Sequence, residues 1–117
     1  MWVSSKYLDK PTEKALRDAL TQRQQLGTIE EKLTRLDEER KKIHAEQKRI
    51  RDNLGSLGDR ASEKELRERF VRTLSQQEDR LEAIATDETR LQGERDTVRE
   101  RLNHLIGQLE FDASLPE

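Results

Sequence analysis

The sequence predicts an all-α protein, a long two-helix antiparallel coiled coil that folds back on itself as a hairpin. Only 31% of the 117 residues are hydrophobic and 41% are charged, which argues against a compact globular core. The net charge is only −2, however, so the composition is not that of a strongly self-repelling disordered chain. Two long stretches carry apolar residues in steps of three and four, and a glycine-containing interruption separates them. This pattern is typical of two helices with heptad seams.

The chain is expected to begin with a lead segment, residues 1–10, outside the coiled coil. Asp9 and Thr12 then flank Pro11, a combination that favours helix initiation because the first turn does not need the N–H that proline lacks. The first coiled-coil helix is predicted over residues 11–57. Gly27 lies inside it, and we expect a local weak point there rather than a break.

The seam of the first helix has two rows. The first row is wholly aliphatic and consists of Ile29, Leu36, Ile43, Ile50 and Leu57. The second row mixes apolar and polar residues and consists of Leu26, Leu33, Arg40, Gln47 and Leu54. Polar residues in a seam lower stability but penalise wrong alignments, so Arg40 and Gln47 are interpreted as register control.

Residues 58–62 are predicted to form the turn. Gly55 and Gly58 can supply the left-handed conformation in which helices commonly end. Ser62 and Glu65 have the spacing of a capping box, which predicts a new helix start.

The second coiled-coil helix is predicted over residues 63–110, followed by a tail, residues 111–117. Its stripe includes three polar residues and consists of Leu66, Phe70, Leu74, Gln77, Leu81, Ile84, Glu88, Leu91, Arg95, Val98, Leu102, Leu105 and Leu109. Because a short connection places helices as antiparallel neighbours, seam residues are expected to pair with numbers that add to about 120. Opening of the turn, with exchange of helices between two chains, is the alternative assembly.

No pattern in the sequence predicts an enzyme, a cofactor site or a metal site. His44 and His104 lie far apart under the predicted pairing, and no cysteine is present. No apolar run is long enough to span a membrane. A structural or protein-interaction module is therefore the leading functional hypothesis.

Apolar residues gather at the open end of the predicted hairpin, beyond what the seam requires. We expect this end to contact itself, a second copy of the chain, or a missing part of a larger parent protein. The residues expected to make this contact are Leu16, Leu20, Leu105, Ile106 and Phe111.

The turn end of the hairpin is basic. Residues 40–72 contain eleven Lys and Arg against six Asp and Glu, a net charge of +5. The alternative function is therefore an arm that binds nucleic acid or an anionic membrane surface. Interleaved acids and the absence of stacking aromatic residues weigh against nucleic acid. The residues expected to contact the anion are Arg49, Arg51, Arg60, Lys64, Arg67, Arg69 and Arg72.

Three segments of the sequence resemble a known family. They are residues 46–54 (EQKRIRDNL), residues 69–71 (RFV) and residues 74–81 (LSQQEDRL). Together they resemble the C-terminal helical hairpin of the bacterial mucoidy-inhibitor-A-like family, whose conserved domain has no assigned function. The resemblance implies that the chain is a hairpin cut from a larger, β-rich protein, and it implies no catalytic residue. The tRNA-binding arm of seryl-tRNA synthetases has a similar shape and exemplifies the nucleic-acid alternative.

Overall fold

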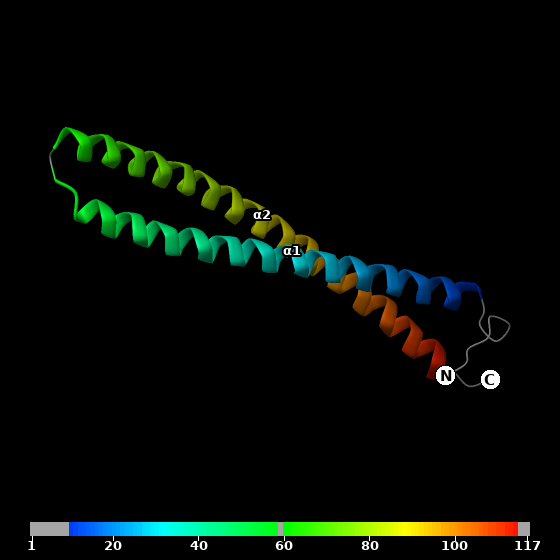
Figure 1. Cartoon of the computed structure of the whole chain (residues 1–117). Helices are drawn as coiled ribbons and strands as arrows, with labels where there is room; N and C mark the ends of the chain where they lie inside the picture. The colour runs from blue at the N-terminus through cyan, green and yellow to red at the C-terminus, as the bar shows by residue number, and fades with distance from the viewer. Residues whose placement is uncertain (1–9, 59, 115–117) are drawn as a thin grey trace. The chain divides into compact units, whose positions relative to one another are not determined.

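The computed structural model describes residues 10–58 and 60–114, which form two long helices and no strand (Figure 1). Helix α1 spans Lys10–Gly55 and helix α2 spans Ala61–Ser114. The two helices make antiparallel contacts, so the predicted all-α helical hairpin is confirmed. Compared with the predicted bounds, α1 begins one residue earlier and ends two residues earlier. Helix α2 begins two residues earlier and continues four residues further.

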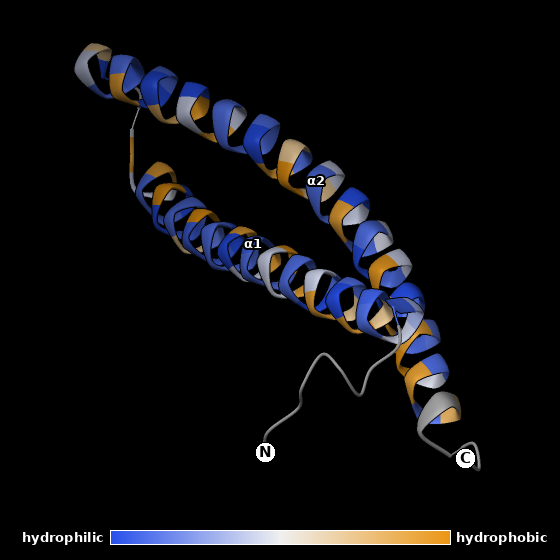
Figure 2. Cartoon of the chain, turned by 90° about the vertical axis from the view of Figure 1, so that its right-hand side faces the viewer, coloured by the Kyte–Doolittle hydropathy of each residue, from blue (hydrophilic) through white to orange (hydrophobic). Residues whose placement is uncertain are grey.

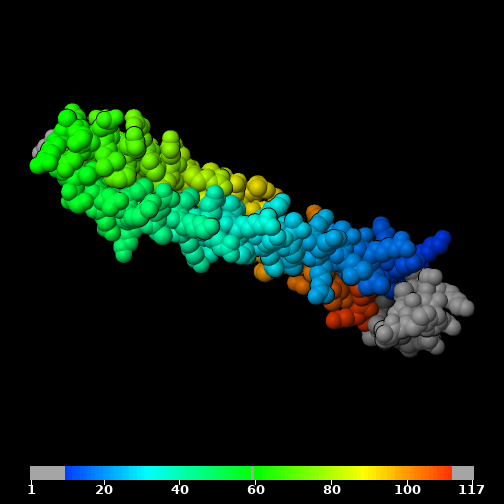
Figure 3. Space-filling model, in the orientation of Figure 1, coloured from blue at the N-terminus to red at the C-terminus, as the bar shows by residue number. Residues whose placement is uncertain are grey.

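Contacts divide the chain into two units. The open-end unit comprises the described residues of 1–32 and 91–117, and the turn-end unit comprises residues 33–90. In the turn-end unit, side chains fill the space between the two ribbons, as the space-filling view shows (Figure 3). Residues 1–9 of the predicted lead segment and residues 115–117 of the predicted tail lie outside the described residues, but Lys10 opens α1 and residues 111–114 extend α2.

The predicted seam of α1 is confirmed. Every seam position from Leu26 to Leu57 is buried or half-buried, and bands of hydrophobic residues recur along both helices among hydrophilic ones (Figure 2). The seam of α2 is buried or half-buried from Phe70 to Leu109, but Leu66 is 37% exposed. The prediction that Leu66 is the first seam residue of α2 was therefore wrong. Glu63 and Arg67, at the steps of four and three that a heptad requires, are the half-buried residues there.

The turn differs from the prediction in its chemistry. No glycine in the described residues has a positive φ, so α1 does not end in a left-handed glycine. Instead, the amides of Ser56 and Leu57 donate hydrogen bonds to the carbonyls three residues earlier, at 3.2 Å each, which tightens the last turn. Ser62 already lies inside α2, so the predicted capping box does not form the start of that helix.

Two side chains of α2 hold the loop. The Gly58 amide donates a hydrogen bond to the Glu63 carboxylate at 3.0 Å, and Arg67 donates to the carbonyls of Leu57 and Gly58 at 3.2 and 3.0 Å. A Cβ atom at position 58 would lie 2.7 Å from the Glu63 carboxylate. Gly58 is therefore the residue that lets this carboxylate approach the backbone.

Ion pairs on the two flanks of the seam fix the helix register. Glu39 and Arg80, each just before a seam position, pair at 2.6 Å with numbers that add to 119. Glu30 and Arg99, each just after a seam position, pair at 3.2 Å with numbers that add to 129. Within each unit, the ion pair corresponds to an antiparallel register in which facing seam residues have numbers that add to 124.

The expected pairing, with numbers adding to about 120, was therefore wrong by four residues, about half a heptad. The asymmetry of the loop explains the offset. Because Arg67 binds the carbonyl of Leu57, the first two turns of α2 lie beside the loop rather than beside α1. The prediction had assumed that both helices end at the same level.

Candidate interaction surfaces

Four of the five residues expected to form the open-end contact are exposed. The exposed fractions are 40% for Leu16, 60% for Leu20, 41% for Ile106 and 62% for Phe111. Leu105, by contrast, is half-buried at a seam position. It therefore contributes to the packing of the two helices, and the candidate contact surface consists of the other four residues.

Three of these residues lie on one flank of the open-end unit. Positions in a coiled coil repeat every seven residues, so Leu16 occupies the same position as Glu30, and Ile106 the same position as Arg99. The ion pair between Glu30 and Arg99 shows that these two positions face the same flank. Leu20 follows Leu16 by four residues and lies on the same face of α1. We call Leu16, Leu20 and Ile106 the apolar flank.

Phe111 lies on the other flank. It lines an open groove together with Pro11, Ala15, His104, Gly107 and Gln108. Gln108 comes just before a seam position, whereas Leu16 and Ile106 each come just after one, so this groove lies on the opposite side of the seam from the apolar flank. The sequence prediction of a single open-end patch therefore resolves into two separate surfaces.

A second groove of about 970 Å³ runs along this same flank of the open-end unit. Its base includes Ile29 and Val98, which are 9% and 7% exposed. Its rims carry mainly uncharged polar groups, from Thr21, Gln24, Gln25, Thr28 and Thr97. The groove is wide and open, unlike the enclosed pockets that bury most of a small ligand.

The basic residues of the turn-end unit are mostly accessible. Arg67 is half-buried and donates hydrogen bonds to the carbonyls of the loop, so its guanidinium is already engaged in the fold. Arg49 lies 3.8 Å from Glu46 on its own helix. The other five predicted anion contacts are exposed and form no ion pair within the described residues: Arg51, Arg60, Lys64, Arg69 and Arg72.

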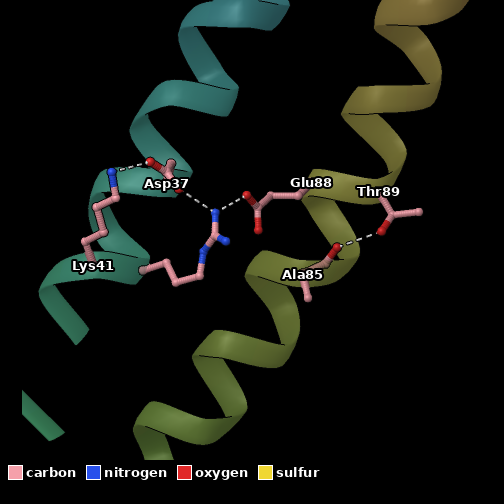
Figure 4. Close-up of polar contacts among 6 residues, drawn as sticks. Asp37, Lys41, Ala85, Glu88 and Thr89 are labelled. Atoms are coloured by element: carbon pink, nitrogen blue, oxygen red, sulfur yellow. Dashed lines mark hydrogen bonds and ion pairs between the residues drawn. The ribbon is translucent and has the colours of Figure 1, made fainter. Parts of the chain in front are cut away.

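Polar side chains connect the two helices within the turn-end unit, near its boundary with the open-end unit in the sequence (Figure 4). Arg40, at a seam position, donates hydrogen bonds to Glu88 across the interface and to Asp37 on its own helix. Lys41 also pairs with Asp37 at 3.0 Å. The hydrogen bond from Lys41 lowers the pKa of Asp37, and the charges of Lys41 and Arg40 act in the same direction.

Two further cross-helix contacts lie nearer the turn than the contact between Arg40 and Glu88. Arg80 forms a two-pronged hydrogen bond to Glu39, which lowers the pKa of the carboxyl and raises that of the guanidinium. Gln47, only 1% exposed, donates to Glu78 at 2.9 Å. Four buried polar atoms at seam positions have no hydrogen-bond partner in the described residues: Gln22 Oε1, Arg40 Nε, Gln77 Oε1 and Arg95 Nε. The polar seam positions are thus only partly satisfied.

The histidines and acidic side chains of the described residues do not form a metal site. His44 and His104 are both exposed, and no group of three or more potential metal-ligating side chains comes together there. No stretch of the described helices combines the length and hydrophobicity that a bilayer-spanning segment requires.

Comparison with protein-family models, curated proteins and solved structures found no match to this chain. The resemblance to the mucoidy-inhibitor-A-like hairpin therefore stays a prediction.

Proposed function

We propose that this chain is a non-enzymatic structural and protein-interaction module, and that its apolar flank is the contact surface. The observation that carries the proposal is the exposure of Leu16, Leu20 and Ile106 on one side of the open-end unit. Elsewhere on the two helices the outward positions are mainly charged or polar. Clustered apolar side chains on a charged surface are characteristic of sites that bind another protein.

The helical scaffold supports the same proposal. A two-helix coiled coil offers exposed helix faces rather than an enclosed pocket, and exposed faces with i, i+3 and i+4 anchors are how helices bind other helices. Leu16 and Leu20 have this spacing on α1.

Site-specific photo-crosslinking in the native cells tests the proposal. A benzophenone amino acid is placed at position 20, and the control carries it at Val71, which is 52% exposed but lies in the turn-end unit. We expect crosslinks to protein from position 20 and few from position 71. Replacing Leu16 by Ser should reduce the crosslinks from position 20. Equal crosslinking from both positions would contradict the proposal.

The second candidate function is anion binding by the turn-end unit. It is favoured by exposed basic side chains, such as Arg60 and Arg72, that form no ion pair among the described residues, in a segment of net charge +5. Nucleic acid and anionic lipid both present the phosphates that such side chains bind. This candidate ranks second because acidic residues, including Glu65 and Glu68, are interleaved with the basic ones.

A further inference from the structure

The apolar flank of α1 carries a second, short seam. Glu13, Leu16, Leu20 and Arg23 follow one another in steps of three, four and three, the spacing that places residues in one stripe along a helix. This stripe is separate from the inner seam, which passes through Ala15, Ala19, Gln22 and Leu26. Leu20 and Arg23 are exposed, and Leu16 is 40% exposed, so the stripe lies accessible on the apolar flank, beside the inner seam.

The short seam is symmetric about residue 18. Leu16 and Leu20 lie two residues to either side, and Glu13 and Arg23 lie five residues to either side. We propose that this seam binds the same seam of a second copy of the chain, antiparallel about a two-fold axis. Leu16 then packs against Leu20 of the second copy, and Glu13 pairs with Arg23 of the second copy. This inference rests on the proposed function, because it names the partner of the apolar flank.

Charge complementarity selects this arrangement. The two ends of the seam carry opposite charges, so an antiparallel second copy brings Glu13 against Arg23 twice, whereas a parallel one would bring like charges together. Arg23 has no ion pair within the described residues. Glu13 pairs with Arg17 on its own helix at 3.1 Å, a surface pair whose arginine is 76% exposed. Such i,i+4 surface pairs contribute little, so Glu13 can accept a second cation.

Helix α2 fits the same axis. In the observed register, facing seam residues have numbers that add to 124, so residue 18 of α1 lies level with Ile106 of α2. The two-fold axis therefore passes beside Ile106, which is exposed on the apolar flank. Two copies would form a four-helix contact with Leu16, Leu20 and Ile106 from each chain at its centre, an isologous interface. No residue other than those of the open-end unit is needed.

A charge-exchange experiment on the full chain tests the proposal. Light-scattering mass across a concentration series should show a monomer–dimer equilibrium. Glu13→Arg and Arg23→Glu should each weaken dimerisation about tenfold or more, because each brings like charges together. An equimolar mixture of the two variants should form a heterodimer at least as stable as the wild-type dimer, because every charge pair is then opposite. Circular dichroism verifies that both variants keep their helicity.

A single-cysteine experiment tests the axis. The chain contains no cysteine, so Ile106→Cys introduces a unique thiol. Oxidation should link two copies through position 106, because a disulfide requires Cα atoms within about 7 Å of each other. The matched control, Val71→Cys, should remain largely unlinked.

Three outcomes would overturn the proposal: a monomer at every concentration, a dimer that neither charge variant weakens, or a mixture that associates no better than its components. A dimer that neither charge variant weakens would indicate exchange of helices through an opened turn instead. A monomer that still photo-crosslinks from position 20 to a different protein would leave the proposed function supported and refute only the second copy as partner.

Discussion

Replacement of Gln47 and Gln77 together by leucine should stabilise the hairpin and weaken its choice of register. In the observed register these two glutamines face each other. Gln47 is 1% exposed and donates one hydrogen bond, to Glu78. The Oε1 atom of Gln77 is buried with no partner in the described residues. The pair therefore occupies core volume while leaving part of its hydrogen-bonding capacity unused.

The expected gain follows from these contacts. Burying a leucine side chain contributes about 1.5 to 3 kcal/mol, and we take the low end for each position because the seam is narrow. Removing the partnerless oxygen of Gln77 recovers about 1 kcal/mol, and losing the hydrogen bond from Gln47 to the charged Glu78 costs about 2 kcal/mol. The exposed Glu78 carboxylate can be hydrated instead. The double variant should thus be more stable by about 2 kcal/mol.

Equilibrium unfolding in urea measures this difference, and a double variant less stable than wild type would refute the reasoning. Register is measured with engineered cysteine pairs. In wild type, cysteines at Ile50 and Leu74 should form a disulfide readily, and cysteines at Ile50 and Phe70 should not. In the double leucine variant both pairs should form, because Gln47 and Gln77 no longer distinguish the two alignments. Unchanged selectivity would show that other contacts set the register.

Three further predictions concern single sites. Ile84→Ala should lower the free energy of unfolding in urea by about 3 kcal/mol, because this side chain is fully buried, and Ile43→Ala should cost clearly less because Ile43 is half-buried; equal costs would contradict this. The lowered pKa of Glu39 means that its pair stabilises the fold above the ordinary glutamate pKa, about 4.3, and that this stability is lost as the pH falls through the lower folded value. As the pH is lowered from above the ordinary glutamate pKa to below the folded pKa of Glu39, the urea midpoint of wild type should therefore fall more than the urea midpoint of Glu39→Gln. If the two midpoints change with pH in parallel, the pair of Glu39 and Arg80 does not have this role. Anion binding by the turn-end unit should weaken steeply with salt and fall further when Arg60 and Arg72 are replaced by Ser; absence of binding to duplex DNA and to anionic vesicles at low salt would eliminate that candidate.

The spacing of apolar residues was sufficient to predict two helices, their approximate ends and nearly every seam position. It was not sufficient to predict the register. A shift of α2 by half a heptad along α1 still brings apolar rows together. The spacing of hydrophobic residues is therefore equally compatible with the predicted and the observed register. Polar seam residues distinguish them. The observed register places Gln47 opposite Gln77, whereas the predicted one would have placed each glutamine opposite an aliphatic side chain.

The contacts that hold the turn were not predicted from the sequence, for a different reason. Glycine is a common helix terminator, but it serves that role through a left-handed conformation that no glycine adopts in the described residues. The loop is instead held by Glu63 and Arg67, two charged side chains that composition alone assigns to the solvent. The spacing in the sequence could have identified these two residues, because Arg67 follows Glu63 by four residues and Phe70 follows Arg67 by three. Applied strictly, the heptad rule would have excluded Leu66 from the seam.

The heptad rule, applied to the exposed residues, also distinguishes the proposed contact surface from isolated exposed apolar residues. Leu66 and Val71 are 37% and 52% exposed, close to the 40% of Leu16, but neither lies three or four residues from another exposed large apolar residue. The short seam of α1 is limited to four residues because the next positions along it are Gly27, which offers no side chain, and Glu30, which is already paired with Arg99. The proposed interface, with only two leucines per α1 and one isoleucine per α2, would bury little area, and small interfaces correspond to weak and reversible association. The proposed dimer should therefore form only where the local concentration of the chain is high.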